Sequence, residues 1–156
     1  MYMFAAWKRD RVSCDGLLRM LADLESYLFR RMICSVSSNG LNKLVPSLIV
    51  RLDSAEGDLA ETFAALLITE TAKATRMPTD SEFRQALLGE NLYRPAWRCK
   101  YLLAGLENYN HPKDPRSFSE YTIEHIMPQN AMAHAEWRNM LADLDRFPLL
   151  ANSLGI

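Results

Sequence analysis

The sequence has few of the features that would point directly to a function. It contains three cysteines, and they are far apart and form no C-x-x-C motif. We therefore expect neither a disulfide framework nor a cysteine-based zinc site, and thiols that stay reduced in a cytoplasmic protein. Only six residues are glycine, and no glycine-rich loop of the kind that binds nucleotide phosphates is present.

Long apolar runs and an excess of either charge are also missing. No run reaches the roughly 18–20 apolar residues that cross a membrane, so we expect no membrane partner. Lysine and arginine number 18 and aspartate and glutamate 19, for a formal net charge of −1. This balance excludes a histone-like nucleic-acid binder but not a local nucleic-acid site. With 49% hydrophobic and 24% charged residues in 156, the composition predicts a folded globular domain.

Apolar residues recur at helical spacing through most of the chain. Leu17, Leu21, Leu24 and Leu28 form one such stripe, in a helix that Ser13 or Asp15 can cap and that ends in 35–40. Further helices are predicted over 41–52, 59–75, 79–89 and 95–109. The fold class is therefore expected to be mainly α, a bundle of about five helices in residues 1–110.

Two local patterns refine these helices. Pro46 lies inside the segment 41–52, so that helix either begins at Pro46 or is kinked there. Thr79-Asp80-Ser81-Glu82 is a capping-box pattern, in which the Thr79 hydroxyl accepts from the Glu82 amide and Glu82 reaches back to the Thr79 amide. This pattern predicts a helix start at residue 79 or 80.

The character of the sequence changes after residue 110. Residues 110–115 form a polar loop with two prolines. Residues 118–128 contain Tyr121-Thr122-Ile123 and are predicted to form a strand, and 133–143 a helix around Trp137, which we expect to be a core anchor. We therefore divide the chain into a helical region, 1–110, and a second part, 111–156.

The residues best suited to chemistry are Glu124 and His125, at the end of the predicted strand and just before Pro128. A histidine is neutral near pH 7 and can take a proton from water. An adjacent carboxylate can supply an oxygen ligand to Mg²⁺. A Glu-His pair is a weak signal by itself, because such pairs are incidental in most proteins.

The surrounding residues resemble a known family. The stretch Thr122-Ile123-Glu124-His125-Ile126-Met127-Pro128-Gln129, followed by Glu136-Trp137 and Leu154-Gly155, resembles the C-terminal nuclease domain of GmrSD-type restriction enzymes. Shorter matches precede it at 30–34, 39–43, 78–84 and 100–107. Enzymes of this type resemble Type IV systems that cleave modified phage DNA, and their nuclease part is HNH-like, of the His-Me finger group.

The resemblance implies roles for individual residues. His125 would be the general base that activates water, and Glu124 would be a ligand of a divalent metal, Mg²⁺ or Mn²⁺. DNA would be the partner of the full-length protein, together with an N-terminal nucleotide-hydrolysing domain. The family pattern continues after Leu-Gly with an asparagine, where this sequence has Ile156. We therefore expect only the start of an HNH-like ββα unit, and little nuclease activity from this chain alone.

Other interpretations stay open at this stage. The chain could be a non-catalytic helical module for interaction or domain coupling, or an inactive relative of the nuclease. Arg94, Arg98 and Lys100 could contact phosphates, although a solvated helix face is the ordinary interpretation. Arg30 and Arg31 could likewise form either a solvated face or a weak anion-binding patch.

Overall fold

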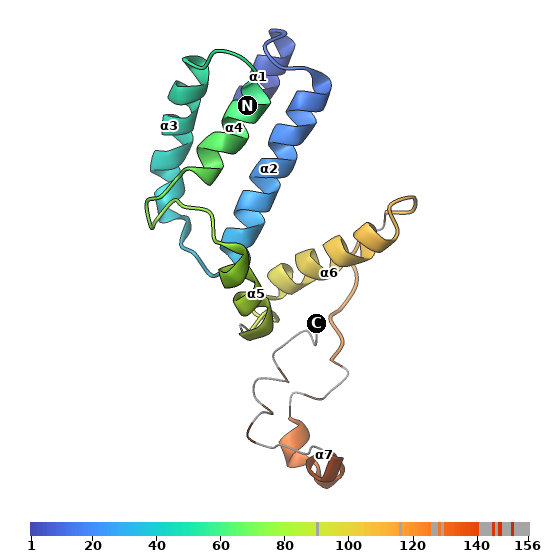
Figure 1. Ribbon diagram of the computed structural model, residues 1–156. Coiled ribbons are helices and arrows are strands. Elements are labelled where there is room, and N and C mark those ends of the chain that lie inside the picture. Colours follow the sequence, from blue (N-terminus) through green and yellow to red (C-terminus); the bar gives the residue numbers. More distant parts are fainter. Residues whose placement is uncertain are drawn as a thin grey trace. The chain divides into compact units, whose positions relative to one another are not determined.

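The computed structural model describes residues 1–89, 91–115, 117–125, 128, 130–140, 145, 147 and 151. The chain forms two compact units, Met1–Phe83 and Arg84–Ile156. All regular structure within the described residues is helical, so the predicted mainly α class is confirmed (Figure 1). The predicted division into a helical region, 1–110, and a second part, 111–156, concerns function and stays a prediction.

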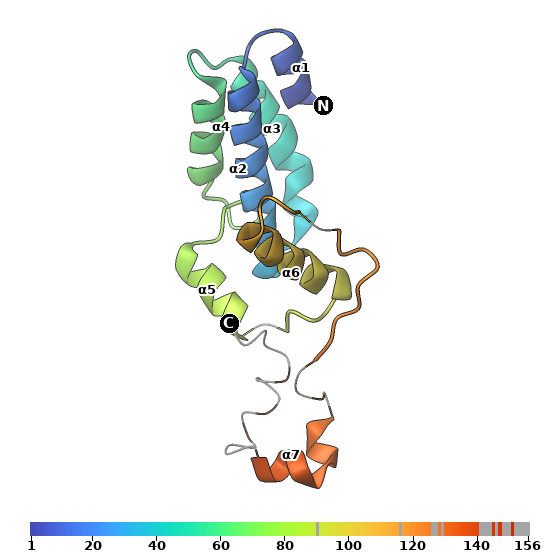
Figure 2. The same ribbon diagram turned by 90° about the vertical axis from the view of Figure 1, so that its right-hand side faces the viewer.

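The first unit contains four α-helices: α1 (Tyr2–Lys8), α2 (Cys14–Ile33), α3 (Leu41–Asp53) and α4 (Leu59–Ile68). A short 3₁₀ turn, η1 (Ser38–Gly40), precedes α3, and α5 (Asp80–Gly89) begins at the end of this unit. Helix α4 packs against both α2 and α3, and α1 packs against α2 (Figures 1 and 2). Helix α1 was not among the predicted elements.

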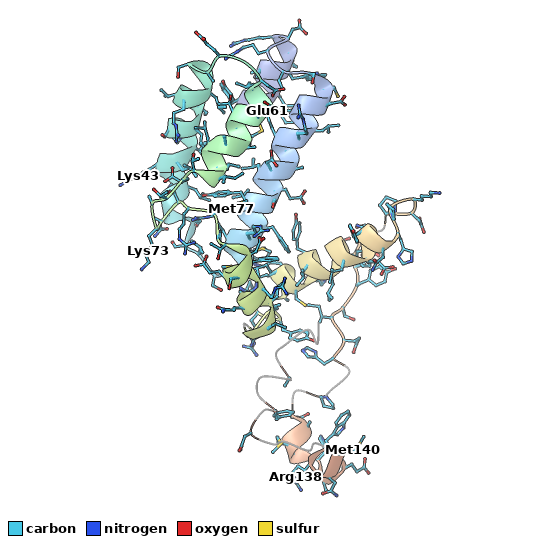
Figure 3. The ribbon with its side chains drawn as sticks, viewed as in Figure 1. Lys43, Glu61, Lys73, Met77, Arg138 and Met140 are labelled. Atoms are coloured by element: carbon cyan, nitrogen blue, oxygen red, sulfur yellow. The ribbon has the colours of Figure 1, made fainter. Side chains whose placement is uncertain are left out.

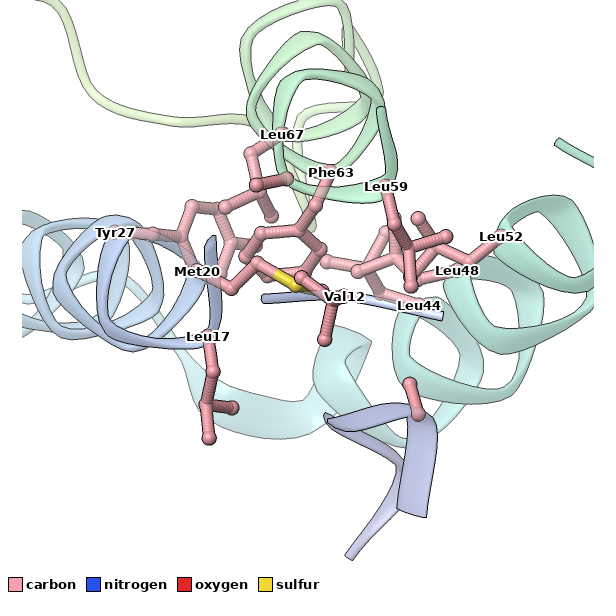
Figure 4. Close-up of a cluster of buried hydrophobic side chains, with 12 residues drawn as sticks. Val12, Leu17, Met20, Tyr27, Leu44, Leu48, Leu52, Leu59, Phe63 and Leu67 are labelled. Atoms are coloured by element: carbon pink, nitrogen blue, oxygen red, sulfur yellow. The ribbon is translucent and has the colours of Figure 1, made fainter. Parts of the chain in front are cut away.

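Large apolar side chains from α2, α3 and α4 meet in one core (Figure 4). Met20, Tyr27 and Phe63 are almost fully buried there. The predicted leucine stripe of α2 is only partly correct, because Leu17 is buried but Leu28 is 41% exposed. The buried face of α2 includes the non-leucine residues Met20 and Tyr27, so it is rotated from the stripe that leucines alone suggest.

Side-chain caps fix where the helices begin. The Gly16 amide donates to Ser13 Oγ at 3.0 Å, which makes Ser13 the cap of α2. Asp58 accepts from the first amides of α4 in the same way. The capping box before α5 is confirmed, because Thr79 N donates to Glu82 Oε2 at 2.8 Å and Glu82 N donates to Thr79 Oγ1 at 3.3 Å.

The predicted helix over 41–52 is confirmed as α3, which starts at Leu41 and continues through Pro46, so of the two alternatives the start at the proline is excluded. The predicted end of the next helix is wrong. Helix α4 ends at Ile68 instead of continuing to residue 75. The following connection, on which Figure 3 marks Lys73 and Met77, is non-helical, and side chains of α2 bind several of its backbone carbonyls.

Arg31 is the main side chain that holds this connection. It is 2% exposed, and its guanidinium donates to Ala74 O at 2.8 Å, Arg76 O at 3.0 Å and Ser37 O at 2.7 Å. The Tyr27 hydroxyl donates to Thr75 O. Arg30 pairs with Asp80 at 2.6 Å. The predicted alternatives of a solvated face or an anion patch therefore do not describe Arg31.

The second unit contains α6 (Ala96–Asn110), the 3₁₀ turn η2 (Ala131–Ala133) and α7 (Ala135–Met140), where Figure 3 marks Arg138 and Met140. A small cluster of Ala131, Phe147 and Ala151 packs with Met132 and Trp137, which confirms Trp137 as a core anchor. The predicted helix 133–143 is found only over 135–140, as α7, because Ala133 ends the 3₁₀ turn and His134 is not helical. Residues 141–143 lie outside the described residues.

The predicted strand over 118–128 is not found in its described residues. Phe118 and Tyr121 close a turn instead, with Tyr121 N donating to Phe118 O at 3.2 Å and the two rings 5.3 Å apart. Residues 122–125 follow without regular structure, while 126, 127 and 129 lie outside the described residues. Strand-forming residues need a neighbouring strand to pair with, and none is present in the described part of the chain.

Candidate functional site

The Glu124-His125 pair lies on the irregular segment that follows the Phe118–Tyr121 turn. His125 is half-buried, and its ring stacks on the ring of Tyr93 with the centroids 4.1 Å apart and the planes inclined by 27°. Glu124 is exposed, and its Oε1 accepts from the Thr122 hydroxyl at 3.3 Å. The two adjacent residues therefore have different surroundings: an aromatic contact for the imidazole and solvent for the carboxylate.

His125 lines a surface pocket of about 320 Å³. One side of the pocket is the start of α6 and the loop before it; the other is the segment that carries the Glu-His pair. Its lining residues are Tyr93, Arg94, Ala96, Lys100, Thr122, Ile123 and His125. Two of them, Arg94 and Lys100, carry positive charge, and none is acidic. The pocket is thus a basic, partly aromatic cavity next to an imidazole.

Arg98 builds the α6 side of this pocket without lining it. Its side chain is 7% exposed, and Nη2 donates to Asn91 O and to Arg94 O, both at 2.5 Å. These bonds fix the loop that presents Tyr93 and Arg94. The prediction grouped Arg98 with Arg94 and Lys100 as phosphate contacts or a solvated face, and for Arg98 both alternatives are wrong because its guanidinium is used inside the protein.

Lys100 connects the two sides of the pocket. It lies on α6, is half-buried, and its Nζ donates to Ser119 O at 3.4 Å. An ammonium group has three donors, so this bond leaves others for the pocket. Sequence reasoning placed Lys100 on a helix, as found, but the helix alone did not show that it faces the segment of His125.

Burial shifts the pKa of two neighbouring groups. It raises the pKa of the Tyr93 hydroxyl further above neutral pH, so the ring next to His125 carries no charge there. Burial likewise raises the pKa of the Cys99 thiol, which is fully buried in α6. The three cysteines differ in burial, because Cys99 is buried, Cys34 is half-buried and Cys14 is exposed.

A divalent metal would find only a partial site in the part of the chain that the structure describes. No three histidine, cysteine, aspartate or glutamate side chains there are grouped as metal ligands. Glu124 offers one exposed carboxylate, which is the number that Mg²⁺ often takes from protein when phosphate oxygens and water complete its shell. The described residues therefore do not form a complete metal centre, but the Glu124 carboxylate can supply one oxygen ligand to a metal.

The other histidines lie apart from this pocket. His111 Nδ1 is 3.2 Å from Glu107 Oε1, one turn back at the end of α6. His134 lines a separate pocket of about 480 Å³, together with Pro128, Glu136 and Trp137. The structure thus brings His125 together with Tyr93, Arg94 and Lys100. Tyr93 was missed because a tyrosine more than a helix away carries no local signal for a histidine partner.

Comparisons with known proteins identify a family over the second half of the chain. The family described as "GmrSD restriction endonucleases, C-terminal domain" matches residues 77–155, which is just over half of the chain and includes Glu124 and His125. The shorter predicted matches at 30–34 and 39–43 lie before it, and they stay predictions. No curated protein and no solved structure matches the chain. Among the described residues, no helix is long and apolar enough to cross a membrane. On the strength of the family match, the chain belongs to the GmrSD restriction endonuclease C-terminal domain family.

Proposed function

We propose that this chain provides the DNA-cleaving site of a restriction endonuclease directed against modified, foreign phage DNA. The observation that carries the proposal is that the family match includes a histidine lining a basic pocket. Restriction requires hydrolysis of a phosphodiester, and a pocket with two cationic side chains and an imidazole suits such an anionic substrate. We include in the proposal that residues 111–156 contribute to an HNH-like ββα unit.

In the proposed reaction His125 is the general base. Its neutral imidazole takes a proton from a water molecule while the water oxygen forms a bond to phosphorus. The bond to the leaving sugar oxygen breaks, and that oxygen keeps the electron pair and takes a proton from solvent. Stacking on Tyr93 restricts the orientation of the ring, which favours a fixed direction for proton transfer. Glu124 is proposed as a ligand of Mg²⁺ or Mn²⁺, and the metal would supply charge stabilisation for the phosphate.

The test is cleavage of modified and unmodified phage DNA by the chain, with Mg²⁺ or Mn²⁺ and with EDTA. We expect the chain alone to cleave slowly, because the resemblance predicts only the start of the nuclease unit. This slow cleavage should depend on the metal, and His125→Ala should reduce it by about 100-fold or more, because general-base catalysis contributes roughly 10²–10⁴-fold. Glu124→Gln should raise the metal concentration needed for half-maximal cleavage. His134→Ala is the matched control and should leave the rate unchanged.

Several outcomes would contradict this assignment. Cleavage that persists in His125→Ala would show that His125 is not the general base. Cleavage that persists in EDTA would show that the reaction needs no divalent metal. If no cleavage of modified DNA is seen even at high metal concentration, the chain does not act as a nuclease by itself, and the second candidate function below is favoured.

The second candidate is a helical module that couples the nuclease to a nucleotide-hydrolysing domain. It is favoured by the first unit, which has its own core and lies mostly before the family match. Helix α6 also exposes apolar side chains, with Trp97 61% and Tyr109 84% exposed. A coupling module predicts that nuclease activity appears, or rises, only when a nucleotide-hydrolysing partner and its nucleotide are added.

A further inference from the structure

The pocket beside His125 holds more positive charge than the proposed base and metal ligand require. Arg94 and Lys100 both line it, although the resemblance assigned a function to neither. We propose that these two side chains form the phosphate-binding site for the DNA strand in front of His125. This inference rests on the proposed function, because it names the residues that hold the substrate of that same site.

The charges in the pocket favour an anion. Arg94, Lys100 and the imidazole of His125 are the titratable lining groups besides Tyr93, and no carboxylate is among the lining residues. Lys100 is half-buried, and its Nζ lies 3.4 Å from Ser119 O, so the ammonium group lies on the side of α6 that faces the segment of His125. Its remaining N–H donors can bind a phosphate in the pocket.

The two cations differ in a way that suits a phosphodiester. Arg94 lies on the loop fixed by Arg98, is exposed, and presents a planar guanidinium that can bind two phosphate oxygens at once. Lys100 acts as a compact point charge. The pocket volume of about 320 Å³ is near the lower end of the roughly 300–1,000 Å³ range of small-molecule sites. It therefore fits one nucleotide unit of a strand.

Tyr93 and the two cations of the pocket have different roles: Tyr93 orients the His125 ring, and Arg94 and Lys100 would bind phosphate. Tyr93 contacts His125 and is neutral, so it adds no charge to the site. Replacing either cation should therefore weaken the binding of DNA, while the position of the imidazole, set by Tyr93, is kept. The phosphate site and the proposed base can be tested independently for this reason.

Binding is measured first, in EDTA, so that no cleavage occurs. Anisotropy of a fluorescently labelled DNA duplex is recorded for the full chain at several salt concentrations. We expect Lys100→Met to weaken binding roughly tenfold and to lower the salt slope by about one, the effect of losing one phosphate contact. Arg94→Met should also weaken binding, and because the Arg94 side chain is exposed the fold should be kept.

Lys113→Met is the matched control, because it removes the same charge from an exposed loop outside the pocket. It should keep wild-type affinity apart from a small general salt effect. Far-ultraviolet circular dichroism checks that all three variants keep their helices. If Lys100→Met and Arg94→Met bind DNA as tightly as Lys113→Met, the inference is wrong.

The location is tested through the imidazole itself. The ring resonances of the three histidines are followed by nuclear magnetic resonance, and His125 is assigned by its loss in His125→Ala. Adding the DNA duplex should shift the His125 resonance in the wild type but not in Lys100→Met, whereas His134 should not move. Inorganic phosphate and ATP serve as comparison probes and should displace DNA only weakly. If ATP binds there and DNA does not, the site is not a DNA site.

The outcomes separate this inference from the proposed function. Cleavage that depends on His125 but not on Lys100 or Arg94 would contradict the phosphate-binding site and support the nuclease activity. Binding that depends on Lys100 and Arg94, without any cleavage under the conditions above, would contradict the nuclease activity and support the phosphate-binding site.

Discussion

Arg31 is a charged side chain that the fold uses as a structural part. Its guanidinium is almost fully buried and donates to two carbonyls of the α4–α5 connection, Ala74 O and Arg76 O, and to Ser37 O. Carbonyl oxygens of a non-helical loop need partners once they are buried. The arginine supplies them from a position on α2 where the sequence pattern indicates only a surface charge.

Removing this group should destabilise the first unit. Arg31→Met keeps most of the side-chain volume but leaves three carbonyls without their donors, and we expect a loss of roughly 3–5 kcal/mol in the free energy of unfolding. Urea denaturation followed by circular dichroism measures it. Arg51→Met, on an exposed face of α3, is the control and should change stability by less than about 0.5 kcal/mol. Equal effects of the two changes would refute the structural role of Arg31.

Glu82 makes the stability of the first unit depend on pH in the acidic range. Hydrogen bonds from Arg76 and from the backbone and hydroxyl of Thr79 lower the pKa of Glu82 from 4.5 to about 2. A carboxyl whose pKa is lower in the folded state stabilises the fold above pH 4.5, and this contribution is lost as the pH falls from 4.5 toward 2. Thermal melting of the wild type and of Glu82→Gln should therefore differ near neutral pH and converge near pH 2.

Glutamine is the informative replacement for Glu82 because it can still reach the Thr79 amide while it cannot ionise. Glu56→Gln changes an exposed carboxylate in the same unit and serves as the control. Its melting temperature should follow that of the wild type at every pH. A constant difference between wild type and Glu82→Gln down to pH 2 would show that ionisation of Glu82 does not matter.

At the scale of an element, the connection after α4 illustrates what the sequence could and could not predict. The apolar spacing of α2 and α4 and the capping box before α5 were sufficient to predict where these helices lie. The course of the chain after α4 was not predictable, because Arg31 and Tyr27 of another helix bind its carbonyls at residues 74–76. In the same way, Tyr121-Thr122-Ile123 has strand-forming residues, but no partner strand is present in the described residues.

Gly40 is the position where η1 passes closest to this connection. A Cβ built there would lie 2.5 Å from Ala74 O and 2.9 Å from Thr75 Cγ2, too close for a normal contact. Gly40→Ala should therefore destabilise the protein by roughly 1–3 kcal/mol. Urea denaturation gives the change in the free energy of unfolding. If Gly40→Ala instead stabilises the protein, as expected when a substitution only reduces chain flexibility, the close approach is contradicted.

Gly105 provides the opposite case within α6. A Cβ there meets no atom within 4 Å, so Gly105→Ala only improves helix propensity and should stabilise the protein by roughly 1 kcal/mol. The structure therefore predicts that Gly40→Ala lowers the free energy of unfolding and that Gly105→Ala raises it. Changes of the same sign would contradict it.

At the scale of the whole molecule, the first unit has a complete apolar core of its own. The twelve buried residues of this core all precede residue 68. We expect residues 1–89, which keep α5 intact, to fold without the rest of the chain. Circular dichroism should show a helical spectrum and one cooperative thermal transition, and Phe63→Ala should lower the free energy of unfolding by roughly 3–5 kcal/mol. A non-cooperative transition in residues 1–89 would contradict this independence.

The candidate site was predictable only in part at this scale. The pair Glu124 and His125 was found from residue types and from the resemblance, and the family match includes both. The roles of the two residues stay predictions. Tyr93, Arg94 and Lys100 could not be assigned to the same pocket from sequence, because their meeting with His125 depends on how the chain returns to α6 after the 111–115 loop.

The hydrogen bonds of Arg98 have a consequence for motion near this pocket. One guanidinium joins the first turns of α6 to the carbonyls of Asn91 and Arg94, and the ring of Tyr93 between them lies against His125. If the first turn of α6 opens, these bonds break and the loop that carries Tyr93 is released with it. Amide hydrogen exchange at the start of α6 and rotational freedom of the His125 ring should therefore rise together, so that local opening of one helix end sets how long the imidazole keeps a single orientation.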